Sequence, residues 1–301
     1  MRERTFEVIE GWGWGGRSLG LGLGPGLGLR RLPAGPEGPA LELIEGRPNG
    51  PETGPPLLFV HGAFGGAWTW SEVVLPYCLR RGRRVLAVSL RGHGGSGGHR
   101  RLREWTLADH VTDVRRALAE LPEPPVVVAH SLGGLLAQRL LGREPMRGLV
   151  LMGSLPPEGM FFEGPRVLAT DPQIWLEAWL GSVGQVRGPI TLAGLQVLFF
   201  EGLPPERVQR YASLMTPESP RALADAHWPG PILPAFLAGV PTLVLGGDSD
   251  RLVSQPSVWR TALYHGAEPH ILPSMGHFLP LDTGAERAAG LVLDWIDRSF
   301  T

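Results

Sequence analysis

The sequence predicts an α/β fold, with a mostly parallel central sheet, helices on both of its faces and an inserted helical lid. Three observations lead to this fold class. From Leu57 onward, short apolar runs alternate with stretches of helical periodicity, which is the pattern of parallel strands joined by crossover helices. One of these runs stops at Ser131, a serine with small residues on both sides. The stretch of residues 155–236, between the fourth and fifth runs, is too long for a single crossover.

Each predicted strand is a short apolar run bounded by turn-forming residues. The six strands expected in the regular part of the chain are residues 57–61, 85–90, 126–130, 149–153, 242–246 and 268–272. A short strand at residues 40–45 precedes them. Gly and Leu alternate over residues 11–29, and this run has two interpretations, an irregular pair of edge strands or a flexible extension.

Helices are predicted where apolar residues recur at spacings of three and four. Thr106 and Asp109 form a variant of the capping box that begins a helix. Its apolar face consists of Leu107, Val111, Val114, Leu118 and Leu121. Further helices are expected at residues 131–141, 172–180, 190–200, 205–215 and 290–300.

The predicted domain organisation is a core interrupted by one insertion. Residues 1–154 form the first part of the core, with residues 1–40 as a glycine-rich extension, and residues 237–301 complete it. Residues 155–236, the inserted segment, are predicted to form a helical lid. Their many apolar side chains suggest an apolar pocket over the strand ends, for which Met160 and Trp175 are candidate lining residues.

Composition narrows the class of partner. The chain has 28 basic residues, all of them arginine, and 29 acidic residues, which gives a net charge of −1. Because no block of like charge is present, we expect no nucleic-acid binding and instead a small, uncharged or apolar partner. The absence of lysine excludes Schiff-base chemistry. No cofactor and no metal site is predicted.

Cys78 is the single cysteine, so the chain has no internal disulfide, which fits a reducing compartment. No apolar run approaches the roughly 18 residues of a membrane-spanning helix. We therefore expect a cytoplasmic protein without stable membrane insertion, and the oligomeric state stays open.

Residues 129–133, Ala-His-Ser-Leu-Gly, have the pattern of a nucleophile elbow. Such a serine lies on a sharp strand-to-helix turn, where the residues two positions before and after it must be small. Ala129 and Gly133 meet this need, although the usual pattern has glycine at both positions. The backbone N–H of Leu132, at the start of the helix, is a candidate oxyanion donor.

The turn at residues 61–66 follows the first regular strand and is expected at the same sheet edge as the serine. The N–H of Ala63 is the first choice for a second oxyanion donor, with Phe64 as the alternative. His61 is expected to brace this turn by hydrogen bonding. In the next turn, residues 91–96, His93 is expected to be structural rather than catalytic.

An acid and a base come late in the chain. Asp248 and Asp250 both follow a strand end, and Asp250 is favoured as the residue that orients a histidine. His277 is the preferred base over His265 and His270, because it follows a glycine in a loop. The order Ser131, Asp250, His277 is the one expected for a catalytic triad on this kind of sheet.

Taken together, these motifs resemble the α/β-hydrolase fold proteins of the lid-bearing type, which include carboxylesterases, lipases, perhydrolases and carbon–carbon bond hydrolases. The resemblance covers about residues 40–300 and rests on residues 61–68, 91–96, 129–134, 247–250 and 276–278. It implies that Ser131 is the nucleophile, His277 the base and Asp250 its orienting acid. The N–H groups of Ala63 and Leu132 would form the oxyanion hole.

The function expected from this resemblance is hydrolysis of carboxylic esters through an acyl-enzyme, with a small-molecule ester of apolar or aromatic character as substrate. The alternatives are a thioesterase or acyltransferase, a carbon–carbon bond hydrolase or a perhydrolase, and, from a different class, a ligand receptor without catalysis. The predicted substrate pocket consists of Phe64, His130, Met160, Trp175 and Phe278.

Overall fold

A computed structural model describes residues 23–172 and 196–300 of the chain. Within these residues, one sheet has eight strands in the order β1-β2-β4-β3-β5-β6-β7-β8. The strands are β1 (Leu27–Leu32), β2 (Leu41–Gly46), β3 (Leu57–Val60), β4 (Val85–Ser89), β5 (Val126–His130), β6 (Gly148–Met152), β7 (Thr242–Gly247) and β8 (Pro269–Leu272). The six predicted strands are all present, with each bound within one residue of its prediction.

The sheet is mixed but mostly parallel. β1 pairs with β2, and β2 with β4, in the antiparallel sense, whereas every pairing from β4 to β8 is parallel. All residues of β3, β4, β5 and β6 are buried, as expected for strands covered on both faces. The predicted fold class is confirmed.

The end of the glycine-leucine run forms an edge strand. Its last residues lie in β1, which pairs with β2 in a regular antiparallel register from Leu27 opposite Gly46 to Leu32 opposite Leu41. The edge-strand interpretation is therefore correct for this part of the run, and residues 11–22 lie outside the described residues.

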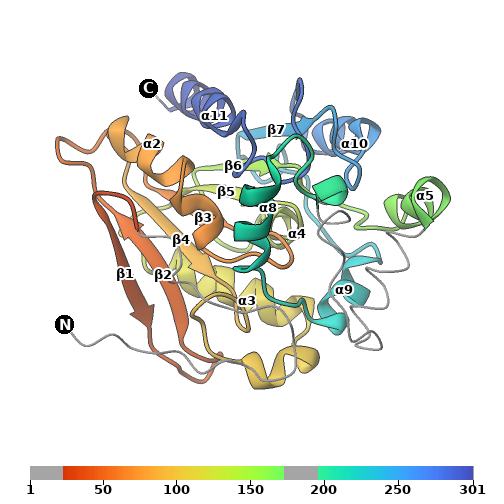
Figure 1. Cartoon of the computed structure of the whole chain (residues 1–301). Helices are drawn as coiled ribbons and strands as arrows, with labels where there is room; N and C mark the ends of the chain where they lie inside the picture. Colours follow the sequence, from red (N-terminus) through yellow and green to blue (C-terminus); the bar gives the residue numbers. More distant parts are fainter. Residues whose placement is uncertain (1–22, 173–195, 301) are drawn as a thin grey trace.

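Two groups of helices cover the two faces of the sheet (Figure 1). One face packs against α1 (Trp68–Ser71), α2 (Val74–Arg80) and α11 (Ala285–Ser299). The other packs against α3 (Leu107–Leu118), α4 (Leu132–Gln138) and α10 (Gln255–His265). A short 3-10 helix, His99–Glu104, precedes α3.

Helix α3 begins where the sequence predicts. The Thr106 hydroxyl accepts a hydrogen bond from the Asp109 N–H (3.2 Å), and the Asp109 carboxylate accepts one from the Thr106 N–H (2.8 Å). This reciprocal pair is a capping box, which satisfies two N–H groups that the first helical turn leaves unpaired.

Helix α11 starts five residues earlier than predicted. Gly290, the predicted first residue, lies inside the helix. A Cβ atom at this position would lie 3.1 Å from the Tyr77 hydroxyl of α2. The glycine thus allows close packing of α11 against α2, which is a tertiary reason that the local sequence does not reveal.

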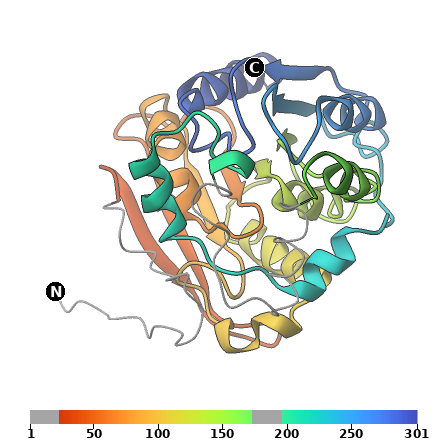
Figure 2. The same ribbon diagram turned by 45° about the vertical axis from the view of Figure 1, so that its right-hand side comes forward.

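The inserted segment contributes α5 (Glu163–Thr170), α8 (Pro205–Ala212) and α9 (Pro220–Ala226), which are spread around one end of the sheet in Figure 2. Helix α8 lies within the predicted range 205–215. The predicted helices at 172–180 and 190–200 lie mostly outside the described residues.

Helices α5 and α9 were not predicted. For α9 the sequence offered a cue, because the Ser219 hydroxyl caps the helix and Pro220 begins it. Among the residues that the structure describes, no helix is long and apolar enough to cross a bilayer.

Two leucines that differ in burial test the described core. Leu58 on β3 is fully buried, whereas Leu29 on β1 is 46% exposed. We expect Leu58→Ala to lower the free energy of unfolding by about 2–5 kcal/mol, because it leaves a cavity, and Leu29→Ala to change it by less than about 0.5 kcal/mol. Urea unfolding of both variants measures the difference, and equal losses would contradict the described core.

Candidate active site

Ser131 lies at the tip of a strained turn between β5 and α4. Its backbone has φ 52° and ψ −122°, a region that residues with a side chain rarely adopt. Three backbone hydrogen bonds hold it there. Its N–H donates to the Met152 carbonyl (3.1 Å), and its own carbonyl accepts from the N–H groups of Gly134 (2.9 Å) and Leu155 (3.1 Å).

Two glycines allow the surrounding backbone to come close to Ser131. A Cβ atom at Gly133 would clash with the His61 carbonyl oxygen, so only glycine lets α4 approach the turn after β3. A Cβ atom at Gly62 would lie 2.7 Å from the Ser131 Cβ. The turn at residues 61–66, called here the β3 turn, therefore lies directly beside the serine.

His277 connects Ser131 to Asp250. Its Nε2 lies 2.9 Å from the Ser131 Oγ, and its Nδ1 lies 2.8 Å from Asp250 Oδ2. The other oxygen of Asp250 accepts the N–H groups of Leu252 (2.8 Å) and Val253 (2.9 Å). Because a carboxylate only accepts hydrogen bonds, Nδ1 carries the ring proton and Nε2 is free to accept the serine proton.

The residues that compete with these in the sequence lie elsewhere. Asp248 is exposed, and hydrogen bonding to the Ser274 backbone lowers the pKa of its carboxyl group, so it orders the turn. His265 is buried against Gln138 (3.0 Å), and His270 is half-buried on β8. The structure therefore brings together Ser131, Asp250 and His277, as the sequence predicts.

The loop of residues 273–279, called here the His277 loop, is held from two sides. Asp282 accepts the Gly276 N–H (3.0 Å), and the Phe199 carbonyl accepts the Phe278 N–H (3.1 Å). Asp282 is not among the residues predicted from the sequence. Its only cue is an acidic side chain a few residues beyond a candidate base.

The N–H groups of Ala63 and Leu132 are available beside the serine. In residues 23–172 and 196–300, no protein atom accepts a hydrogen bond from either of them. For Leu132 this follows from its position as the first residue of α4, where an N–H has no partner within the helix. Phe64 has φ 65°, and its carbonyl accepts the Thr216 N–H (3.1 Å), which ties the inserted segment to the β3 turn.

His61 braces the β3 turn, as expected. Its Nδ1–H donates to the Gly62 carbonyl (2.7 Å), and its Nε2 accepts the Leu90 N–H (3.0 Å). The second bond requires a neutral ring, because only an unprotonated Nε2 can accept. Burial lowers the pKa of His61 to about 3, with a further contribution from nearby His93.

The predicted pocket residues have different surroundings. Phe64 meets Phe199, which the sequence analysis did not assign to the site, at 5.9 Å between ring centroids, and Phe199 lies 6.0 Å from the His277 ring. Phe278 is buried in the apolar cluster that contacts α8, and partly buried Met160 packs against the core.

His130 is fully buried and donates a hydrogen bond to the His277 carbonyl (2.8 Å), so its ring is enclosed by protein rather than open to a pocket. Trp175 lies outside the described residues.

A separate buried cluster ties the inserted segment to the core. The Glu218 carboxylate lies 3.1 Å from His93 Nε2 and 3.2 Å from His110 Nε2. Burial opposes the charged forms, but their mutual attraction raises the pKa of His93 and holds that of Glu218 well below its usual value. His93 is thus an ion-pair partner, in agreement with the structural role expected for it.

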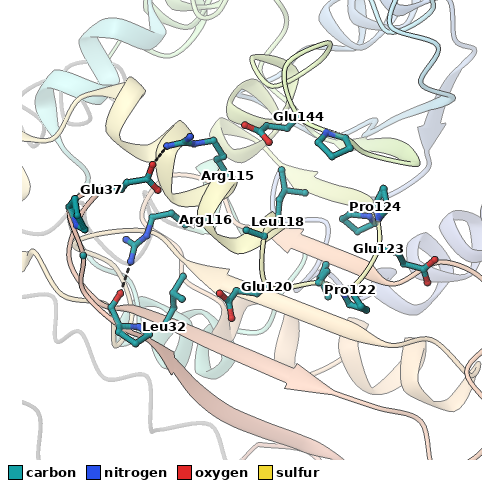
Figure 3. Close-up of a pocket in the computed structure, with 17 residues that line it drawn as sticks. Leu32, Glu37, Arg115, Arg116, Leu118, Glu120, Pro122, Glu123, Pro124 and Glu144 are labelled. Atoms are coloured by element: carbon teal, nitrogen blue, oxygen red, sulfur yellow. Dashed lines mark hydrogen bonds and ion pairs between the residues drawn. The ribbon is translucent and has the colours of Figure 1, made fainter.

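A cleft of about 680 Å³ lies away from Ser131, between the turn after β1, the C-terminal part of α3 and a proline-rich stretch near Pro122 (Figure 3). Glu37 and Arg115 form an ion pair across it. None of its lining residues belongs to the Ser131, Asp250 and His277 group. The cleft is therefore separate from the candidate site at Ser131.

No group of three or more His, Cys, Asp or Glu side chains in the described ranges is arranged to hold a metal ion.

Residues 55–283 match the family described as the α/β hydrolase fold. This match covers most of the chain, so the protein belongs to the α/β-hydrolase fold family.

Two curated relatives illustrate the range within the family. The chain is 39% identical over 105 residues to a pimeloyl-[acyl-carrier protein] methyl ester esterase of Aromatoleum aromaticum, a match that spans 34% of this chain and 38% of the relative. It is 26% identical over 250 residues to a non-heme haloperoxidase of Rhodococcus erythropolis, which spans 75% of this chain and 86% of the relative.

Solved structures share the fold at lower identity. A putative lipase of Acinetobacter baumannii superposes with a TM-score of 0.67 at 22% identity, over 91% of this chain and 92% of that one. A thermophilic esterase of Thermogutta terrifontis gives a TM-score of 0.63 at 19% identity, over 91% of this chain and 100% of that one.

The buried neutral histidines predict acid sensitivity. Burial lowers the pKa of His61 to about 3 and of His265 to about 4, whereas both have a pKa near 6.5 when unfolded. Below pH 6.5 the unfolded chain binds protons that the folded chain does not, so stability falls by up to about 1.4 kcal/mol per pH unit for each histidine. The raised pKa of His93 adds stability that is complete below pH 6.5 and is lost as the pH rises above it, so His93 does not alter the slope in the acid range.

Urea unfolding at pH 7.5, 6.5 and 5.5 measures this loss. His265→Gln removes one of the groups with a lowered pKa and leaves the serine site untouched, so the unfolding free energy of this variant should depend less steeply on pH. An unchanged slope in this variant would contradict the assignment.

Proposed function

We propose that the protein is a serine hydrolase that cleaves carboxylic esters through an acyl-enzyme. One observation carries the proposal, namely the continuous hydrogen-bonded line from the Ser131 Oγ through His277 to Asp250, which starts at a strained strand-to-helix turn. This is the arrangement in which a base activates a nucleophile and is itself oriented by an acid. Relatives named as esterases support the choice of ester substrates.

In the proposed reaction, His277 Nε2 takes the Ser131 proton as Oγ attacks the ester carbonyl carbon. The N–H groups of Ala63 and Leu132 bind the resulting oxyanion, a contribution on the order of 3 kcal/mol for each donor. The C–O bond to the alcohol then breaks, and the alcohol leaves with the proton from His277. Water attacks the acyl-enzyme with the same histidine as base, which releases the acid and restores Ser131. Asp250 stabilises the imidazolium that forms in each half-reaction.

The substrate is proposed to be a small to medium ester with an apolar or aromatic group. The support is apolar surface beside the base, where Phe64 and Phe199 pack together and Phe199 faces His277. Such rings favour apolar acyl or alcohol groups, because burying them releases surface from water.

Perhydrolysis is a second candidate, favoured by the haloperoxidase that matches 75% of this chain. Hydrogen peroxide would then take the place of water in the second step. Its oxygen attacks the acyl carbonyl, the bond to the Ser131 Oγ breaks, and the proton returns to Oγ through His277 as a peroxycarboxylic acid leaves. Peracid formation from an ester and hydrogen peroxide would distinguish this activity from simple hydrolysis.

Replacing the nucleophile tests the main proposal. We expect wild type to hydrolyse some member of a p-nitrophenyl ester series from acetate to palmitate, and Ser131→Ala to lose more than about 10⁴-fold in kcat. Far-UV circular dichroism should be the same for both proteins, because the substitution removes one hydroxyl group. Retained turnover in Ser131→Ala would exclude the mechanism. A wild type that reacts at Ser131 with a fluorophosphonate and cleaves no ester would redirect the search to another acyl substrate.

The two aspartates near β7 give a matched pair of variants. Asp250→Asn should lower kcat by about 10²–10⁴-fold, because the amide cannot hold the required tautomer of His277 or stabilise its charge. Asp248→Asn changes an exposed residue of the same turn and should leave kcat within about threefold of wild type. Steady-state kinetics of both variants measure the contrast, and a reversed order would show that the acid is misassigned.

A further inference from the structure

We propose that His130 is a positioning residue, which fixes the distance between the Ser131 Oγ and the His277 imidazole and holds both against the β3 turn. The inference rests on the proposed function, since it concerns the same serine and base. Three features of His130 carry it, namely its bond to the His277 loop, its contact with Gly62 and its neutral charge.

The first feature closes a ring of interactions. The His130 Nε2–H donates to the backbone carbonyl of His277 at 2.8 Å, and the side chain of His277 bonds the Ser131 Oγ at 2.9 Å. Ser131 is covalently joined to His130. His130 thus fixes the backbone of His277, and Ser131, the next residue, fixes its side chain. Together they set the distance between Oγ and Nε2 that proton transfer requires.

Other restraints on the His277 loop start farther away. Asp282 holds the loop at Gly276, and Phe199 holds it at Phe278. Neither of these belongs to the elbow, so neither relates the loop directly to the serine. The hydrogen bond from His130 does, because any movement of the elbow moves its donor.

The second feature is contact with the β3 turn. A Cβ atom at Gly62 would lie 2.9 Å from His130 Nδ1 and 2.7 Å from the Ser131 Cβ. The fully buried ring of His130 therefore fills the space between the β3 turn and the His277 loop. Its centroid also lies 4.9 Å from those of the His277 and Phe278 rings, each tilted by 50° to it, and these two contacts restrict the ring plane.

The third feature is charge. Nδ1 of His130 has no hydrogen-bond partner within residues 23–172 and 196–300, which fits a neutral ring with its proton on Nε2. Burial lowers the pKa of His130 well below its usual value, and the facing titratable groups, His277 and His61, lower it further. A neutral ring does not repel the positive charge that His277 takes up during the proposed reaction.

Two substitutions separate the hydrogen bond from the packing. His130→Phe keeps a flat ring and removes the donor, whereas His130→Gln keeps a neutral N–H donor of similar reach. We expect His130→Phe to lower kcat by about 10–100-fold with KM within about threefold of wild type, because a displaced base slows proton transfer without weakening binding. His130→Gln should recover most of this loss.

His265→Phe is the matched control. His265 is also buried and hydrogen-bonded through both ring nitrogens, to Gln138 and to the Ala235 N–H, yet it lies outside the serine site. Its substitution should lower stability without lowering kcat in the folded protein. If His130→Phe does not fold, His130→Asn, whose amide is too short to reach the carbonyl, takes its place with the same expected loss.

The rate of fluorophosphonate labelling of Ser131 serves as a second readout that needs no substrate. It should fall in parallel with kcat in His130→Phe and recover in His130→Gln. Equal rates in wild type and His130→Phe would overturn the inference, as would equally low rates in His130→Phe and His130→Gln. If wild type cleaves no ester but still labels at Ser131, the proposed function fails, and the labelling rates alone decide the role of His130.

Discussion

The positive backbone φ of Ser131 is the constraint on which the rest of the site depends. A conformation that costs of order 1–3 kcal/mol persists only where the surroundings over-determine it. Here β6 and the start of the inserted segment supply hydrogen bonds to its N–H and carbonyl, and Gly133 and Gly62 allow the neighbouring backbone to close around it. The parallel sheet makes this possible, because the carboxyl ends of β3, β5 and β6 meet at one edge.

The buried histidines are divided by their partners into neutral and charged ones. His61 and His130 bond backbone groups and remain neutral beside the serine. His93 instead faces the Glu218 carboxylate, which compensates the cost of burying its charge, and His110 contacts the same carboxylate. The neutral pair braces the candidate site, whereas the cluster around Glu218 fastens the inserted segment to the core. The same residue type therefore serves two purposes, selected by whether a carboxylate is within reach.

Much of the candidate site could be predicted from the sequence, because its parts follow strand ends. Ser131, Asp250 and His277 each come directly after or near an apolar run, and parallel topology gathers such positions at one edge. The sequence favours Asp250 over Asp248, and the structure supplies the physical difference, since Asp250 is buried and bonds the histidine whereas Asp248 is exposed. Asp282 and Phe199 were missed because each acts on the His277 loop through contacts formed only after folding.

The sequence by itself determined the strands, the capping box at Thr106 and the elbow, because periodicity, caps and small residues act over a few neighbouring positions. Only the tertiary structure decided which elements and side chains contact one another. Gly290 sits inside α11 to admit Tyr77, and the hydrogen bond from His130 to His277 joins positions 147 residues apart. Contacts of that range depend on how whole elements pack, and no local preference of the chain specifies them.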